Sequence, residues 1–181
     1  QCAEHGVQFP DPRPTEQLER KDWDPKCKMC QGPVSMLATD EVLVNPHNSY
    51  AMSKYTGERI AMMLGRRYMI PSVGMRYSIV QGSRQSFRNA YSGVLRIFAM
   101  QLLAGQRPTA YEDGQQMRDY VHVADVASAN LLALEHNATD FQVFNVGGDQ
   151  RVTVIEFARV MAEKLGRGHI DPILSGEYRF G

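Results

Sequence analysis

Strand-like apolar runs alternate with helical patterns along most of this chain, and this alternation limits the folds open to it. Helices are expected over residues 49–68, 90–104, 125–136 and 153–166, and strands over 72–80, 109–112, 118–123 and 142–148. Because helices of ten or more residues separate the strands, the strands are expected to pair in parallel. The sequence therefore predicts an α/β protein.

Polar residues at the predicted helix starts support these bounds. Ser49 and Asp125 are expected to cap two of the helices, because their side-chain oxygens can accept hydrogen bonds from otherwise unpaired backbone N–H groups. Thr153, followed three residues later by Glu156, has the pattern of a capping box. These signals place the helix starts to within a few residues.

Composition argues against several classes of function. The chain carries 20 basic and 20 acidic side chains, so it lacks the net positive charge typical of nucleic-acid binding. No apolar run approaches the ~20 residues of a membrane-spanning helix, and no secretory signal precedes the first helix. We expect a cytoplasmic protein without nucleic-acid or membrane partners. Because the sequence starts at Gln1 and stops after 177–181 without a closing element, we also expect a longer parent protein.

Tyr50 and Lys54 form the first candidate site. They are four residues apart on a predicted helix, so both side chains lie on one face. A phenol is a weak base at neutral pH, and a nearby cation lowers its pKa, which makes the oxygen a usable proton donor and acceptor. The alternative is a solvated tyrosine beside a solvated lysine, since this spacing also arises by chance.

The motif order favours the catalytic interpretation. Tyr50-x-x-x-Lys54 is followed by MRYSIVQG (75–82), then RDYVHV (118–123), then FNVGG (144–148). Over about residues 40–181 the chain resembles the extended short-chain dehydrogenase/reductases, specifically the NAD-dependent nucleotide-sugar epimerases and dehydratases. The resemblance implies a Rossmann-like doubly wound parallel sheet, here its C-terminal half, with a small substrate-binding α/β region.

The resemblance also assigns roles to residues. It implies that Tyr50 is the catalytic acid/base and that Lys54 assists it and holds the nicotinamide ribose of NAD. It places Tyr77 and Ser78 beside the nicotinamide, and it implies a homodimer formed through the tyrosine helix. The family's Gly-rich phosphate loop is missing from these 181 residues, and so is its catalytic Ser or Thr. We expect both in the preceding part of a longer enzyme.

Three further residues are expected to bind a nucleotide-diphosphate sugar. The planar guanidinium of Arg118 suits a diphosphate, although a nearby carboxylate such as Asp119 could pair with it instead. By resemblance Arg118 grips the diphosphate, and Tyr111 and Arg179 add contacts. Ile79 stands where many relatives have a substrate-binding asparagine, so the usual contact with the sugar is lost or moved.

The resemblance implies epimerisation of the sugar at C4 through transient oxidation to a keto-sugar. A 4,6-dehydratase or a reductase on the same scaffold is one alternative. A non-catalytic module that binds sugar nucleotides or zinc is another, because a fold does not fix a function.

The first 41 residues show no periodicity and hold every cysteine of the chain. Cys2 and His5 form a C-x-x-H pair, and Cys27 and Cys30 form a C-x-x-C pair. Two such pairs have the ligand number and spacing of a structural zinc site. A redox pair and three unrelated thiols are the alternatives. A subset of the resembled family carries a cysteine-containing insert before the tyrosine helix. We therefore predict three regions: a zinc-binding insert (1–41), the catalytic part (42–147) and a C-terminal substrate-binding region (148–181).

Overall fold

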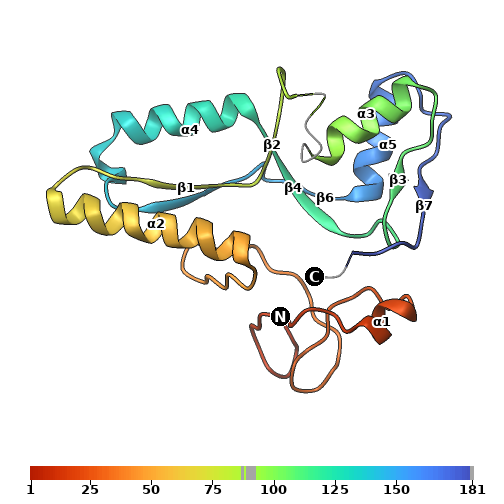
Figure 1. Ribbon diagram of the computed structural model, residues 1–181, viewed down its shortest axis with the longest axis horizontal. Helices are drawn as coiled ribbons and strands as arrows, with labels where there is room; N and C mark the ends of the chain where they lie inside the picture. Colours follow the sequence, from red (N-terminus) through yellow and green to blue (C-terminus); the bar gives the residue numbers. More distant parts are fainter. Residues whose placement is uncertain (87, 89–92, 180–181) are drawn as a thin grey trace. The chain divides into compact units, whose positions relative to one another are not determined.

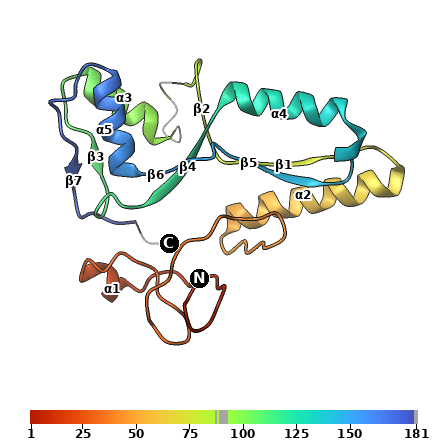
Figure 2. The same ribbon diagram turned by 180° about the vertical axis from the view of Figure 1, so that it is seen from behind.

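The computed structural model describes residues 1–86, 88 and 93–179 (Figures 1 and 2). The chain divides into two compact units, and each unit is assembled from separate stretches of sequence. Unit 1 comprises Gln1–Ala38, Phe87–Arg118 and Val152–Gly181, and unit 2 comprises Thr39–Ser86 and Asp119–Arg151. No helix in the described ranges is long and apolar enough to cross a membrane.

Unit 2 contains parallel strands flanked by helices. Its elements are α2 (Ser49–Tyr68), β1 (Gly74–Tyr77), β2 (Ile79–Gln81), α4 (Val123–Glu135), a 3-10 turn (Asn137–Thr139) and β5 (Val143–Val146). Strand β1 pairs in parallel with β5, and β2 pairs in parallel with β4 (Met117–His122), which enters from unit 1. Helices α2 and α4 lie on opposite sides of the β1–β5 pair (Figures 1 and 2). The predicted parallel α/β arrangement is present.

Unit 1 holds the N-terminal segment and the chain's last elements. Its elements are α1 (Thr15–Glu19), α3 (Val94–Leu103), β3 (Thr109–Ala110), α5 (Val154–Lys164) and β7 (Ile173–Leu174), and β6 (Arg151–Thr153) enters it from unit 2. Helix α3 packs against α5, and Phe98, Leu102 and Ala158 are fully buried on these helices. The helix expected over 90–104 corresponds to α3, which begins at Val94. Residues 90–92 lie outside the described ranges.

Two predicted helix caps were wrong by a few residues. Asn48 caps α2, since its Oδ1 accepts a hydrogen bond from the Ala51 N–H at 2.8 Å, and Ser49 is the first helical residue. Similarly, Nδ1 of His122 accepts from the Ala124 N–H at 3.2 Å, which leaves Asp125 in the first turn of α4. In both cases a polar residue before the expected cap already has the extended backbone that a cap requires.

The strand expected over 72–80 is divided at Ser78. The Ser78 N–H donates to the Val146 carbonyl at 2.9 Å, and its hydroxyl donates to the Asp119 carbonyl. Strand β1 therefore pairs with β5 and β2 with β4, and Ser78 joins the two pairings. The glycines that follow β5 permit a close approach of backbones: a Cβ at Gly148 would lie 1.8 Å from the Tyr120 carbonyl oxygen.

The capping box at the start of α5 is confirmed. Oγ1 of Thr153 accepts from the Glu156 N–H at 3.2 Å, and the Glu156 carboxylate accepts from the Thr153 N–H at 2.8 Å. We expect Thr153→Ala to lower the free energy of unfolding by about 1 kcal/mol, because it removes the cap of a helix that packs in the core. Urea denaturation measures this. Thr56→Ala, on the exposed surface of α2, is the matched control and should shift stability by less than about 0.5 kcal/mol.

Candidate active site and metal centre

Helix α2 presents Tyr50 and Lys54 side by side at its N-terminal end. Lys54 Nζ lies 5.5 Å from the centroid of the Tyr50 ring. Tyr50 is 71% exposed, and the small residues Ala51 and Ser53 stand beside it. The helix thus brings together a phenol and an ammonium group on an accessible face.

Tyr77 and Ser78 lie in the same unit, at the end of β1. The Tyr77 hydroxyl donates to Asn130 Oδ1 at 2.9 Å, and the Tyr77 side chain is 45% exposed. The Ser78 side chain is occupied with the Asp119 carbonyl. Any contact of Ser78 with a cofactor would therefore use its backbone carbonyl or need its hydroxyl to turn.

Tyr111, Arg118 and Arg179 all lie in unit 1. Arg179 stacks on Tyr111, with its Cζ 5.4 Å from the ring centroid. Arg118, in strand β4, is exposed, and its Nη1 donates to the adjacent Met117 carbonyl at 2.8 Å. Among the described residues no carboxylate forms an ion pair with Arg118. Three side chains suited to a polyanion are thus carried by the segment after β3, by β4 and by the chain's last described residues.

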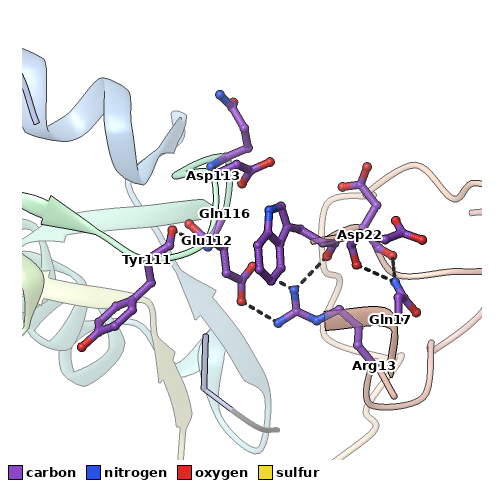
Figure 3. A network of polar contacts seen from close by, with 10 residues as sticks. Arg13, Gln17, Asp22, Tyr111, Glu112, Asp113 and Gln116 are labelled. Atoms are coloured by element: carbon purple, nitrogen blue, oxygen red, sulfur yellow. Dashed lines mark hydrogen bonds and ion pairs between the residues drawn. The ribbon is translucent and has the colours of Figure 1, made fainter. Parts of the chain in front are cut away.

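Unit 1 also contains an ion pair, between Arg13 and Glu112, that the sequence does not predict. Arg13 donates two hydrogen bonds to the Glu112 carboxylate, each 2.8 Å long, as Figure 3 shows. The partners are separated by 99 positions, and neither belongs to a motif. Only the buried position of Glu112, 7% exposed, marks it as unusual, and burial of this kind has no signal in sequence.

The four predicted metal ligands lie together. The Sγ atoms of Cys2 and Cys27 are each 3.6 Å from His5 Nδ1, and Cys2 Sγ is 3.7 Å from Cys30 Sγ. All four ligand atoms lie within 4.8 Å of one another. A tetrahedral zinc ion with Zn–S near 2.3 Å and Zn–N near 2.0 Å needs separations of about 3.8 Å between sulfurs and about 3.6 Å between sulfur and nitrogen. The donor set fits zinc.

Local backbone turns create this arrangement. Cys2 and Gly6 exchange backbone hydrogen bonds of 2.9 and 3.0 Å, and the Cys27 N–H donates to the Gly32 carbonyl at 2.9 Å. Backbone N–H groups of Cys30 and Met29, together with the other two thiols, lower the pKa of Cys27 to about 6 despite its burial. The lowered pKa favours the thiolate of Cys27, which is the form that binds a metal.

Comparison with known proteins identifies the family. Residues 29–147 match the "NAD dependent epimerase/dehydratase family". The chain belongs to this family. It is 27% identical over its whole length to the dTDP-L-rhamnose 4-epimerase of Burkholderia thailandensis, of which it covers 48%. It spans less than half the length of the curated relatives that it matches first.

Solved structures of epimerases share the fold. The UDP-glucose 4-epimerase of Thermotoga maritima, solved with UDP-glucose, matches with a TM-score of 0.73 and 32% identity over 81% of this chain and 46% of that one. The UDP-glucose 4-epimerase of Thermus thermophilus, solved with NAD, matches with a TM-score of 0.62 and 30% identity over 83% and 44%. The Rossmann-like α/β fold expected for the epimerase/dehydratase family is confirmed.

The candidate site residues lie partly inside and partly outside the range 29–147 that matches the family. Tyr50, Lys54, Tyr77, Tyr111 and Arg118 fall within the part that matches the epimerase/dehydratase family, as does Ser78. Arg179 and three of the four metal-ligand candidates fall outside it. Membership of the family therefore does not account for the cluster of Cys2, His5, Cys27 and Cys30.

Proposed function

We propose that the full-length protein epimerises a nucleotide-activated sugar, at C4, in an NAD-dependent reaction. The observation that carries this proposal is the pairing of Tyr50 with Lys54 on the accessible face of α2, in a chain of the epimerase/dehydratase family. The cofactor-binding candidates in this chain, which are Tyr50, Lys54, Tyr77 and Ser78, fit the nicotinamide end of NAD. The phosphate-binding loop is not among the 181 residues. When bound, NAD would accept a hydride from the sugar carbon and return it.

The chain's own residues would handle the proton. Tyr50 Oη accepts the proton of the sugar hydroxyl while the carbon–oxygen bond becomes a carbonyl, and it gives the proton back when the carbon is reduced on its opposite face. Lys54 stabilises the phenolate electrostatically and donates to the ribose. Tyr77 and Ser78 border the nicotinamide. The net redox change is zero, so no second substrate is consumed.

Three residues of unit 1 would hold the substrate's diphosphate. Arg118 provides a fork of N–H donors that no carboxylate in the described ranges occupies. Arg179 is held against Tyr111, so its guanidinium loses little conformational entropy when it binds a phosphate. Relatives solved with UDP-glucose or with NAD support the class of ligand, and Ile79 leaves the identity of the sugar open.

We also propose that Cys2, His5, Cys27 and Cys30 bind one structural zinc ion. Four protein ligands complete a tetrahedron and leave no position for a catalytic water. The segment around them contains one short helix, α1, and few other regular elements, so metal binding would supply much of its folding free energy. A homodimer formed through α2, and a cytoplasmic location, complete the proposal by resemblance. Sedimentation of the full-length protein tests the dimer.

The activity is tested with the full-length protein and UDP- or dTDP-hexoses labelled with deuterium at C4. We expect the C4 epimer as product, with the deuterium retained, because a hydride that returns to the same carbon does not exchange with water. A 4-keto-6-deoxy product would identify the dehydratase instead. Tight binding without turnover would favour the non-catalytic module. Proton NMR of the reaction mixture separates the three outcomes.

A further inference from the structure

We propose that Arg13 is a positioning residue that couples the metal centre to the diphosphate site. Through it, residues 1–38 hold residues 111–118 and the terminal residues 175–179 in the arrangement that presents Tyr111, Arg118 and Arg179. This inference rests on the proposed function, and it adds a role for the N-terminal segment that metal binding alone does not imply.

The Arg13 guanidinium links two stretches of unit 1. Its Nη1 donates both to Glu112 Oε2 and to the Trp23 carbonyl, each at 2.8 Å, and its Nη2 donates to Glu112 Oε1 (Figure 3). The side chains of Arg13 and Glu112 are 21% and 7% exposed, so water screens the pair only weakly. Hydrogen bonds from Arg13 are the main reason that the pKa of Glu112 is lowered. Arg13 is thus the main electrostatic partner of Glu112.

The backbone of Glu112 adopts an uncommon conformation that contacts with the surrounding residues must stabilise. Its φ angle is 54°, in the left-handed region that residues with a Cβ rarely adopt. Its N–H donates to the Glu177 carbonyl at 2.8 Å, and its own carbonyl accepts from the Gly176 N–H at 3.3 Å. The same residue thus receives the Arg13 guanidinium through its side chain and the terminal residues through its backbone.

The neighbours of Glu112 are the proposed ligand-binding residues. Tyr111 precedes it and carries the stacked Arg179, and the Tyr111 carbonyl accepts from Gln116 Nε2 at 3.1 Å. A rotation of the backbone at Glu112 would therefore move Tyr111 directly. It would also move the terminal residues that carry Arg179.

The N-terminal side of the link leads to the metal ligands. Buried Gln17 donates to the carbonyls of Asp22 and Asp24, at 2.9 and 2.7 Å, and so fixes the turn that contains Trp23. The Trp23 ring lies 6.1 Å from that of Tyr178, the residue before Arg179. Cys27 follows Asp24 by three positions. Loss of the metal would release this turn and, with it, both contacts to the substrate-binding residues.

The test uses the full-length protein with Arg13→Gln, Glu112→Gln and the double variant. Calorimetry gives the dissociation constants of UDP, dTDP and NAD, and hydrogen exchange reports on the backbone of 111–118 and 175–179. Each variant is measured with its metal and after removal of the metal by a chelator. Arg20→Gln is the matched control, because it removes the same charge from an exposed position seven residues away. Arg13→Lys keeps the charge but not the two parallel hydrogen bonds.

We expect Arg13→Gln and Glu112→Gln each to weaken binding of the nucleotide diphosphate about 10-fold. The double variant should lose no more affinity than either single variant, because both substitutions break the same interaction. Exchange in 111–118 and 175–179 should accelerate, and the NAD dissociation constant should stay within about twofold. Arg13→Lys should fall between the parent and Arg13→Gln. Removing the metal should weaken binding in the parent and weaken it less in Arg13→Gln, where only the Trp23–Tyr178 contact is left to lose.

Two results would overturn the coupling. In the first, Arg13→Gln and Arg20→Gln show the same hydrogen exchange in 111–118 and 175–179 and the same affinity for the nucleotide diphosphate. In the second, removal of the metal weakens nucleotide binding equally in the parent and in Arg13→Gln. If the parent binds neither UDP nor dTDP, the proposed function fails, and hydrogen exchange alone then decides whether Arg13 transmits the state of the metal centre to the loop.

Discussion

Tyr50→Phe is expected to lower the turnover number of the full-length protein by about 10²- to 10⁴-fold, the contribution typical of a positioned general acid/base. Phenylalanine keeps the ring that lies beside Lys54 and removes only the oxygen that exchanges the proton. Affinities for NAD and for the nucleotide sugar should therefore change by less than about threefold. Steady-state kinetics with the substrate found active, and calorimetry for the two ligands, measure the two effects separately.

Tyr68→Phe is the control for this variant. Tyr68 is the last residue of the same helix, is 60% exposed and also lies near a cation, with Arg67 Cζ 5.6 Å from its ring centroid. Removal of its hydroxyl should leave turnover at the parent value. Parent-like turnover in Tyr50→Phe would refute the assignment of Tyr50. A fall in both variants would indicate damage to α2 rather than loss of a proton carrier.

Cys27→Ser is expected to abolish stoichiometric zinc binding and to unfold residues 1–38 locally. Cys27 is fully buried, its thiolate is within reach of the other three ligands, and a serine hydroxyl is a poor replacement for a thiolate on zinc. Structural zinc contributes roughly 10–16 kcal/mol of apparent binding free energy in small domains, so the loss of one ligand should outweigh the segment's other contacts. Atomic emission gives the metal content, and limited proteolysis reports on the segment.

Met29→Ser separates metal loss from a general effect of substitution. Met29 lies between the two cysteines and is 71% exposed, so its replacement should leave the metal content and the proteolysis pattern unchanged. Protein purified without metal, with residues 1–38 still resistant to protease, would contradict the proposed zinc site. Turnover in Cys27→Ser should persist at a reduced affinity for the nucleotide sugar, because the proposed proton transfer at Tyr50 does not use the metal.

Local signals in the sequence predicted local structure well. The helix over 49–68 has the bounds of α2, since an apolar period and a polar start specify a helix without help from distant residues. The pairs Cys2/His5 and Cys27/Cys30 were predictable for the same reason, because each forms within a single turn. The geometry around them agrees with the ligand set that their spacing suggested.

Features that depend on distant partners were not predictable. The division of the expected strand at Ser78 depends on Val146 and Asp119, which are far along the chain. The Arg13–Glu112 pair spans 99 positions and has no periodic or motif signal. His122 lies among apolar residues in the sequence, which would favour burial, whereas it is exposed and caps α4, because it ends β4.

The contact between Trp23 and Tyr178 gives the molecule an optical consequence. Trp23 is the only tryptophan in this sequence, and its ring lies 6.1 Å from that of Tyr178, at an interplanar angle of 49°. At this separation light absorbed by the tyrosine is passed to the indole. Separation of the turn from the terminal residues is therefore expected to lower the Trp23 emission that is excited through Tyr178, so the joining of these two stretches can be followed in real time without any attached dye.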